Sequence, residues 1–355
     1  MLELGLFGVI LQNNILFEIK NNLGIITLNR AAALNAISGE MFSILFSELE
    51  KWKNDASIKA VLIKSSCEKA FCAGGDLREI YQNRHESIEK TSDYFALEYA
   101  VDSLIYHYPK PYISFLNAIT MGAGVGISIH GSHPIGTENL KLAMPETKIG
   151  YFPDVGASYY LSRLPNAMGI YLGLTGNTIN AADAKELNLI KHIVPSENLH
   201  NLEKKLIETD FNFSDKNRVT EIINAVEIQS EQTKQSDLLK NNDIIQNCFS
   251  QESVEKIINT LKNNQNNFCA EIFDQLQQRS PTSLKVTLEQ FRRAKSMSFD
   301  QVIEMDFFIA KQMLLGHDFF DGIRAMVIDK DHHPQWNPSE LNNVTDEMVS
   351  QYFNA

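Results

Sequence analysis

Residues 60–76 read AVLIKSSCEKAFCAGGD, an apolar run that leads into a turn of small residues. The aliphatic run Ala60–Lys64 predicts a buried strand. The turn Ala70–Asp76 contains two glycines, which let a ligand approach the backbone, and Asp76 is placed to cap a following helix. Taken alone, the turn is explained by an ordinary strand-to-helix connection. The stretch predicts the alternation of strands and helices that builds a layered α/β protein.

Similar elements flank this stretch on both sides. Ile15–Ile19 and Gly24–Leu28 are apolar runs separated by asparagines, which predicts a β-hairpin. Ser38–Trp52 has apolar residues at helical spacing behind a serine cap, which predicts a helix. Pro111–Leu116 predicts another strand, and the glycine-rich run Met121–Gly126 follows it. The first half of the chain is therefore expected to form an α/β layered structure.

The composition changes after about Pro195. The residues that follow are rich in Asn, Gln, Lys and Ile and contain no strand-like run. We therefore expect an α/β core over residues 1–195 and a mainly helical C-terminal region over residues 196–355 that packs on the core. Periodic apolar residues predict helices in this second region at Ser253–Leu261, Ser280–Phe291 and Phe299–Leu315.

The composition is that of a globular protein with no general affinity for polyanions. Of the 355 residues, 44% are hydrophobic and 21% are charged, so the chain can bury a core without disulfides. The formal charge of -12 argues against nucleic acid or an anionic membrane surface as a partner. The cysteines lack the spacing of a metal site, so we expect reduced thiols and no metal: Cys67, Cys72, Cys248 and Cys269.

The amino terminus is not typical of a secretory signal. The stretch MLELGLFGVIL is apolar but short. It lacks the basic n-region of a signal peptide, carries Glu3 and is followed by no small-residue cleavage site. No apolar run in the sequence is long enough to span a bilayer. We expect a soluble protein that is cytoplasmic in a bacterium. The mitochondrial matrix is the alternative in a eukaryote, although no transit peptide is visible.

Common nucleotide-binding and hydrolase motifs are absent or altered. Met121–Gly126 supplies GxGxG and not GxGxxG, so a dinucleotide site is weakly supported. The chain has no P-loop motif and no GxSxG elbow, which disfavours a Ser-His-Asp hydrolase. The glycines of Gly122–Gly124 either expose backbone amides at a strand end or allow a buried helix to pack closely.

Two acids stand eight residues apart in the stretch AMPETKIGYFPDVG, residues 143–156. The neighbours of Glu146 and Asp154 in sequence are largely apolar or aromatic. Burial among such residues raises the pKa of a carboxyl group, which suits a general base or a nucleophile. The alternative is that each acid is an ordinary helix-cap or turn residue.

Together, these motifs resemble the enoyl-CoA hydratase/isomerase (crotonase) superfamily, and more narrowly its 3-hydroxyisobutyryl-CoA hydrolase branch. The resemblance extends from about Leu16 to about Phe353. It implies a crotonase-type α/β spiral of ββα turns with a helical C-terminal layer, and an acyl-CoA site in the core. The segments that carry it are ITLNR (26–30), LNAI (34–37), KAFCAGGD (69–76), ITMGAGVG (119–126), AMPETKIGYFPDVG (143–156) and GHDFFDGIRAMVIDKD (316–331).

The resemblance implies an oxyanion hole made of two backbone amides. These are the amides of Ala73 and Ala123, and Gly74 and Gly122 would lie beside the substrate. Hydrolases of this branch commonly carry glycine at the position of Ala123. The difference should matter little, because the amide and not the side chain is used.

The resemblance also implies roles for three acids. Glu146 matches the glutamate that hydratases and hydrolases share, and Asp154 matches an acid of the hydrolase branch that would bind the 3-hydroxyl group of the substrate. Glu98 matches a further substrate-contacting acid, with a solvated helix residue as the alternative. Gly126 stands where hydratases carry their first catalytic glutamate. Because hydration of a double bond uses two carboxylates, simple enoyl hydration is disfavoured.

The implied activity is hydrolysis of 3-hydroxyisobutyryl-CoA to 3-hydroxyisobutyrate and CoA, a step of valine catabolism. It implies no cofactor and no metal, since CoA enters as part of the substrate and the amides polarise the carbonyl group. Such folds usually associate as homo-oligomers, and the sequence leaves the oligomeric state open. The alternatives are an enoyl-CoA isomerase or hydratase of the same fold, and a non-catalytic acyl-CoA-binding protein.

Overall fold

The computed structural model describes residues 14–211, 215–227 and 237–354, so the amino-terminal stretch for which no signal peptide is expected lies outside the described residues. The chain divides into two compact units that interleave along the sequence. Unit 1 comprises Met1–Gly75, Ala100–Leu142 and Ile179–Ser236, and unit 2 comprises Asp76–Tyr99, Ala143–Thr178 and Asp237–Ala355. The change of composition at Pro195 falls inside unit 1, because the first helices after it belong to the same compact unit as the strands.

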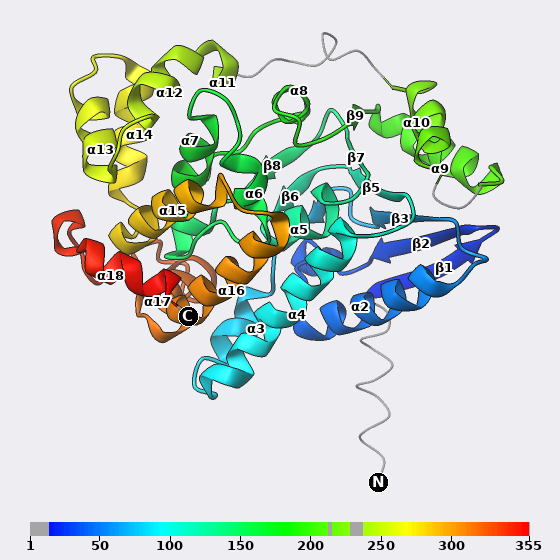
Figure 1. The fold of residues 1–355 in the computed structure, drawn as a ribbon, viewed down its shortest axis with the longest axis horizontal. Coiled ribbons are helices and arrows are strands. Elements are labelled where there is room, and N and C mark those ends of the chain that lie inside the picture. Colours follow the sequence, from blue (N-terminus) through cyan, green and yellow to red (C-terminus); the bar gives the residue numbers. More distant parts are fainter. Residues whose placement is uncertain (1–13, 212–214, 228–236, 355) are drawn as a thin grey trace. The chain divides into compact units, whose positions relative to one another are not determined.

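The larger sheet of unit 1 has six strands in the order β1-β2-β3-β5-β7-β9 (Figure 1). The predicted hairpin is confirmed, since β1 and β2 pair antiparallel with Ile15 opposite Leu28. The other neighbours pair in parallel. The strands are β1 (Ile15–Lys20), β2 (Leu23–Leu28), β3 (Ala60–Ser65), β5 (Tyr112–Leu116), β7 (His133–Gly136) and β9 (His192–Ile193).

Helices cover both faces of this sheet, as the alternation of side chains along a strand requires. Leu23 and Ile25 of β2 belong to one buried cluster with apolar residues of α9 (Leu199–Glu208) and α10 (Lys216–Asn224). The intervening Gly24 faces Trp52 instead, so closely that a Cβ atom there would lie 2.5 Å from the indole ring.

Trp52 belongs to α2 (Gly39–Asn54), the helix predicted from its apolar spacing. The side chain of Ser38 accepts a hydrogen bond from the Met41 amide at 3.2 Å, as an N-cap residue does. The helix buries one apolar face, made of Met41, Phe42, Leu45, Leu49 and Trp52.

A smaller sheet has the order β4-β6-β8 and positions two turns that matter for the site. Its strands are β4 (Ala70–Cys72), β6 (Ile119–Met121) and β8 (Lys141–Ala143). β4 and β6 run parallel, so the turns that follow them lie at the same edge. The turn after β6 leads into the fully buried helix α5 (Ala123–Ile129), so close packing of a buried helix is confirmed for this run.

Past β9 the described residues form helices and single helical turns and contain no strand, as predicted for the C-terminal region. α15 (Pro281–Ala294) and α16 (Phe299–Leu315) match two of the predicted helices, and α13 (Val254–Lys262) matches the third. No helix within the described ranges is both long and apolar enough to cross a membrane. The remaining helices named in Figure 1 are α3 (Leu77–Gln82), α4 (Ile88–Tyr106), α6 (Ala157–Leu161), α7 (Met168–Thr175), α8 (Ala181–Glu186), α11 (Asp237–Lys240), α12 (Asn242–Phe249), α14 (Asn267–Gln277), α17 (Asp318–Ile323) and α18 (Asp346–Ser350).

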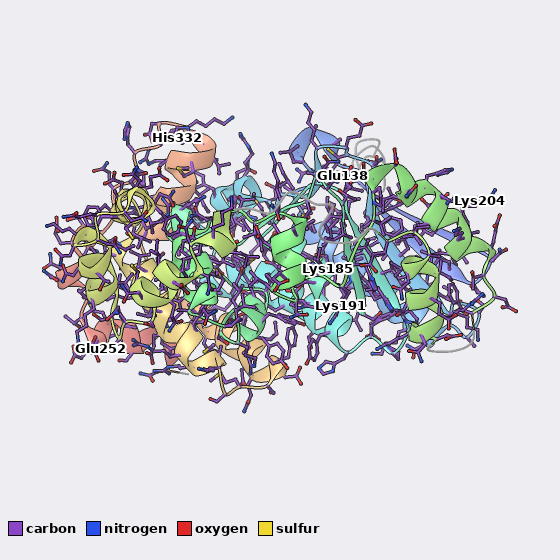
Figure 2. The ribbon with its side chains drawn as sticks, turned by 90° about the horizontal axis from the view of Figure 1, so that it is seen from above. Glu138, Lys185, Lys191, Lys204, Glu252 and His332 are labelled. Carbon is purple, nitrogen blue, oxygen red and sulfur yellow. The ribbon has the colours of Figure 1, made fainter. Side chains whose placement is uncertain are left out.

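Side-chain hydrogen bonds attach the start of this helical region to the sheet of unit 1. Glu138, labelled in Figure 2, follows β7 and accepts a hydrogen bond from the Ser196 amide at 2.9 Å. It also accepts one from the Ser196 hydroxyl. Ser196 begins a 3₁₀ turn that leads directly into α9.

Gly124→Ala should destabilise unit 1. A Cβ atom at Gly124 would lie 2.6 Å from the carbonyl oxygen of Cys72, a backbone atom that cannot rotate away. Overpacking of this kind typically costs about 1–3 kcal/mol, so we expect a clearly lower Tm in thermal unfolding.

Gly316→Ala is the matched control and should lower Tm less, because a Cβ atom there would lie 3.3 Å from the Met313 carbonyl oxygen, a much milder contact, and the backbone φ is -83°. An unchanged Tm for Gly124→Ala would contradict the close packing of α5 on β4.

Candidate active site

The loop that carries the LNAI motif fixes the turn after β4. Asn35 is fully buried, and its side-chain amide donates to the Ser65 hydroxyl at 2.7 Å and to the Phe71 carbonyl at 2.9 Å. The Ile37 amide donates to the Gly74 carbonyl at 2.9 Å. The motif therefore acts as a support that holds the backbone of the turn in one conformation.

One predicted oxyanion donor, the Ala73 amide, already has an acceptor in this conformation. The Ala73 amide donates to the carbonyl oxygen of Leu34 at 3.0 Å, so its N–H group is already used. The Gly74 amide approaches the Cys72 sulfur at 3.4 Å. The Gly75 amide makes no hydrogen bond to any described residue. Gly75 is thus the amide of this turn that remains able to bind an oxyanion. The sequence did not identify it, because Ala73, Gly74 and Gly75 are consecutive small residues and a motif does not show which of their amides lacks an acceptor.

The second predicted donor, the amide of Ala123, has no acceptor among the described residues. It lies in the first turn of α5, where Val125 and Gly126 already donate to the Gly122 carbonyl. Gly122 has φ 50° and ψ -121°, a conformation open mainly to glycine. A Cβ atom at Gly74, for which φ is 117°, would lie 3.5 Å from the Met121 carbonyl. The two turns are therefore in contact, as their parallel strands require.

Glu146 belongs to unit 2, at the start of a 3₁₀ turn, Glu146–Ile149. Its side chain is 7% exposed, and Oε2 is buried without a hydrogen-bond partner in the described part of the chain. Burial, with the nearby Asp154 carboxyl as a second cause, raises the pKa of Glu146 well above its usual range. An oxygen left unsatisfied in this way is available to a water molecule or to a substrate.

Asp154 lies in the same unit and is also buried. Burial raises its pKa from 3.8 to about 7, and a hydrogen bond from the Tyr99 hydroxyl opposes part of that rise. The Tyr99 hydroxyl donates to Asp154 Oδ2 at 2.8 Å and lies 3.3 Å from the Tyr151 hydroxyl. Both carboxyl groups are enclosed, which an ordinary helix-cap or turn residue does not require.

Glu98 lies on α4 and is only 3% exposed. The alternative of a solvated helix residue is therefore wrong. Its carboxyl group contributes to the raised pKa values of Tyr94 and Tyr99, after the larger effect of burial, so it lies close to the two phenols. Glu98 is part of the same buried polar cluster as Asp154.

Aromatic rings surround the two tyrosines whose hydroxyl groups contact Asp154. Tyr151 stacks on Phe319 with ring centroids 4.3 Å apart, and Phe95 lies 5.7 Å from Tyr151. Tyr99 contacts Phe95 at a centroid distance of 6.2 Å. The tyrosines were not singled out from the sequence, although both stand near predicted acids in the chain.

The segment GHDFFDGIRAMVIDKD supports the turn that carries Glu146. A Cβ atom at Gly150 would lie 2.5 Å from the carbonyl oxygen of Asp318, and one at Gly322 would overlap the carbonyl of Ile149. α17 therefore packs directly on the backbone of residues 146–150. On the other side, the Thr147 hydroxyl donates to the Leu174 carbonyl at 3.0 Å.

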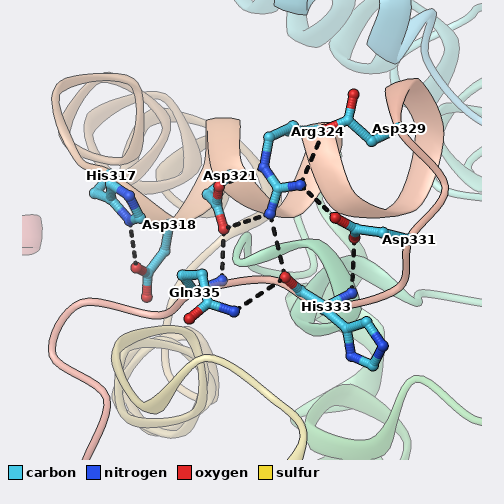
Figure 3. Close-up of polar contacts among 8 residues, drawn as sticks. All are labelled: His317, Asp318, Asp321, Arg324, Asp329, Asp331, His333 and Gln335. Atoms are coloured by element: carbon cyan, nitrogen blue, oxygen red, sulfur yellow. Dashed lines mark hydrogen bonds and ion pairs between the residues drawn. The ribbon is translucent and has the colours of Figure 1, made fainter.

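Arg324 holds this supporting segment together (Figure 3). Its guanidinium group pairs with Asp321 at 2.7 Å, Asp329 at 3.0 Å and Asp331 at 2.7 Å. It also donates to the His333 carbonyl at 3.2 Å. The sequence identified this segment without assigning a role to it, and the structure places it against the turn that carries Glu146.

No group of three or more His, Cys, Asp or Glu side chains is arranged to hold a metal ion within the residues the structure describes. The expectation of a reaction without metal or cofactor stays a prediction. The two amides belong to unit 1 and the three acids to unit 2.

A family model described as enoyl-CoA hydratase/isomerase matches residues 23–353. The chain belongs to the enoyl-CoA hydratase/isomerase family. A protein from Danio rerio named 3-hydroxyisobutyryl-CoA hydrolase, mitochondrial, is 38% identical over 97% of this chain and 90% of its own length. The protein of that name from Homo sapiens is 36% identical over 96% of this chain and 88% of its own length.

A solved structure confirms the expected fold of this family member. A protein named carnitinyl-CoA dehydratase from Mycobacterium thermoresistibile has a TM-score of 0.88 and 32% identity, with 96% of each chain covered. Together with the helices after β9, this confirms the prediction of a crotonase-type α/β fold with a helical C-terminal region.

The pKa of Asp154 predicts how stability depends on pH. The unfolded carboxyl group loses its proton near pH 3.8 and the folded one near pH 7, so the folded protein holds an extra proton between these values. Stability therefore falls as pH rises through this window. Asp154→Asn removes the buried charge, so at pH 8 its Tm should be higher than that of the wild type. The corresponding gain in the free energy of unfolding is at most about 4 kcal/mol.

The gain should shrink towards zero as the pH is lowered to 4. Thermal unfolding of both proteins across this range measures it. Glu304→Gln, which removes an exposed carboxyl group, is the control. A difference in Tm that stays constant with pH would mean that Asp154 does not titrate as described.

Proposed function

We propose that this protein hydrolyses the thioester of 3-hydroxyisobutyryl-CoA to 3-hydroxyisobutyrate and CoA, a step of valine catabolism. The buried pair of Glu146 and Asp154 carries the proposal, because it combines an acid with a free oxygen and an acid poised near neutral pH. The relatives named 3-hydroxyisobutyryl-CoA hydrolase, which match nearly the whole chain, support the substrate.

In the proposed reaction, the amides of Gly75 and Ala123 bind the thioester carbonyl oxygen. Gly75 takes the place first assigned to Ala73, since the Ala73 amide donates to Leu34. Negative charge develops on the carbonyl oxygen as the carbon is attacked, and two donors already in place stabilise it. The loss of one such donor costs roughly 3 kcal/mol of barrier in acyl-transfer enzymes.

Glu146 supplies either the nucleophile or the general base. In the first route its carboxylate attacks the carbonyl carbon and forms a mixed anhydride, which water then cleaves. In the second route it removes a proton from an attacking water molecule. Both routes form a carbon–oxygen bond and break the carbon–sulfur bond, and CoA leaves as a thiolate that takes up a proton.

Asp154 binds the 3-hydroxyl group of the substrate. Tyr99 donates to Oδ2 at 2.8 Å, and Tyr151 also hydrogen-bonds to the carboxyl group, so the two phenols orient it for this contact. A pKa of about 7 also lets the carboxyl group exchange a proton near neutral pH. Glu98 completes the polar lining, and Gly74 and Gly122 give the acyl group access to the backbone amides.

The reaction needs no cofactor and no metal, since CoA is part of the substrate and the amides polarise the carbonyl group. The partner is an acyl-CoA thioester, and neither nucleic acid nor a membrane is part of the proposal. Homo-oligomers remain a prediction. The names of the relatives place those proteins in mitochondria. A mitochondrial location is the one that this similarity supports, and the cytoplasmic alternative stays a prediction.

Hydration of an enoyl-CoA is the second candidate, because one similar solved structure is that of a protein named carnitinyl-CoA dehydratase. Gly126 argues against it. The residue lies in buried α5 and offers no carboxyl group, so Glu146 would have to serve both the water and the adjacent carbon.

The purified protein should release free thiol from 3-hydroxyisobutyryl-CoA and leave the enoyl absorbance of crotonyl-CoA nearly unchanged. Both signals can be followed in parallel. Rapid loss of the enoyl absorbance without thiol would favour the hydratase. Binding of both thioesters without turnover would favour the non-catalytic alternative.

Glu146→Gln should lower thiol release by roughly 10²–10⁴-fold, because the amide keeps the size of the side chain but has neither basicity nor nucleophilicity. The Tm should not fall, since a neutral group replaces a buried carboxyl group. Glu304→Gln again serves as the control. Activity within a few-fold of wild type would remove Glu146 from the mechanism.

Asp154→Asn should impair turnover of 3-hydroxyisobutyryl-CoA more than that of isobutyryl-CoA, which lacks the hydroxyl group. A site built around a substrate hydroxyl loses most when that pairing is disturbed. The ratio of the two kcat/KM values measures the effect. Equal losses for both substrates would assign Asp154 a role unrelated to the hydroxyl group.

A further inference from the structure

The turn that presents Asp154 has an unfavourable backbone conformation. Val155 has φ 52° and Gly156 has φ 73°, so two consecutive residues lie in the left-handed region. For a β-branched residue such as valine this conformation is rare and costs free energy. Something outside the turn must therefore hold it in place.

Two buried polar side chains hold both ends of this turn. Asp306 on α16 is fully buried, and its Oδ2 accepts a hydrogen bond from the Gly156 amide at 2.9 Å. Gln290 on α15 is also fully buried, and its Nε2 donates to the Pro153 carbonyl at 2.9 Å. The same Nε2 donates to Asp306 Oδ1 at 2.8 Å, which joins the two side chains.

The orientation of the Gln290 amide follows from its partners. The Pro153 carbonyl and the Asp306 carboxyl group are both acceptors, so the NH₂ end must face them. This leaves Gln290 Oε1 buried without a hydrogen-bond partner among the described residues. An unsatisfied buried oxygen costs free energy, so the arrangement is not the one that stability alone would favour.

The apolar surroundings leave the turn no room to relax. A Cβ atom at Gly156 would lie 2.6 Å from the Phe299 ring at the start of α16. Asp306 has no ion pair within the residues that the structure describes, and burial is the first cause that raises its pKa. A buried carboxyl group held only by neutral N–H groups is seldom retained for stability, because apolar residues would pack there at lower cost.

We propose that Asp306 and Gln290 are positioning residues for Asp154, and that they set the preference for a substrate with a 3-hydroxyl group. They clamp Pro153 and Gly156, the residues on either side of the Asp154–Val155 pair, and so fix where the Asp154 carboxyl group points. Neither side chain contacts the substrate in this scheme. The proposal rests on the proposed hydrolase function and adds the origin of its selectivity.

Asp306→Asn is the first test, because asparagine can accept from only one of the two donors. We expect kcat for 3-hydroxyisobutyryl-CoA to fall by roughly tenfold or more, since small displacements of a reacting group cost that much, while KM changes little. Turnover of isobutyryl-CoA should fall less. The ratio between the substrates is insensitive to the folded fraction of the sample, because unfolding lowers both rates equally.

Glu304→Gln is the matched control, since it makes the same chemical change at an exposed position two residues away on α16. Gln290→Leu should reproduce the selectivity loss of Asp306→Asn, because it removes both N–H donors. Equal loss for both substrates in both variants would overturn the proposal and leave a purely structural role.

A double variant shows whether Asp306 acts through Asp154. Adding Asp306→Asn to Asp154→Asn should cause no further loss of selectivity, because the positioned group is already altered. Losses that multiply would show that the two residues act independently and would overturn the proposal.

Hydrogen exchange tests the clamp without any activity. The Gly156 amide should exchange at least roughly tenfold faster in Asp306→Ala than in the wild type, since its acceptor is gone, while amides in the middle of α16 keep their protection. If Asp306→Ala does not fold, Asp306→Leu, which also lacks an acceptor for the Gly156 amide, allows the same measurement.

Unchanged exchange in a folded variant would overturn the clamp. Absence of thiol release by the wild type would instead overturn the proposed function, and the exchange result would still stand. The two failures are therefore distinguishable.

Discussion

Backbone-to-backbone contact at glycines is the constraint on which each half of the site depends. α5 lies against the Cys72 carbonyl at Gly124, and α17 lies against the Glu146 turn at Gly150 and Gly322. At these places a single methyl group would have to displace a carbonyl oxygen. Because peptide groups do not repack as side chains do, the positions of the amides and of Glu146 are set by close backbone packing more than by side-chain packing.

The second constraint is electrostatic. Glu146, Asp154 and Asp306 are buried together in unit 2, and burial raises the pKa of each. Within the described residues none of them forms a direct ion pair, and the charge of Lys148 only partly opposes the effect of burial on Glu146. Such a cluster costs stability at neutral pH, and aromatic packing and the Arg324 network offset that cost nearby. The buried acids are thus retained although they lower the local stability, as is common in active sites.

Much of this organisation could be predicted from the sequence, because local signals were strong. The β1–β2 hairpin, the Ser38 cap and the helices after Pro195 follow from spacing and turn chemistry. The Ala73 amide could not be judged in this way, since whether an N–H group is free depends on the Leu34 carbonyl nearly forty residues away. Asp306 and Gln290 were missed for the same reason. They are ordinary polar residues in helical sequence, and only tertiary structure brings them to Pro153 and Gly156.

The interleaving of the two units has a consequence for how such a protein can change during evolution. The chain passes from one unit to the other repeatedly, at Gly75, Tyr99, Leu142, Thr178 and Ser236. A single crossover between two related genes therefore cannot exchange one whole unit and leave the other intact. The partners of the Asp154 turn, which lie more than a hundred residues downstream, would be inherited separately from it. Substrate preference in this fold should therefore change mainly through paired point substitutions in the Asp154 turn and its partners, and seldom through the exchange of a whole unit.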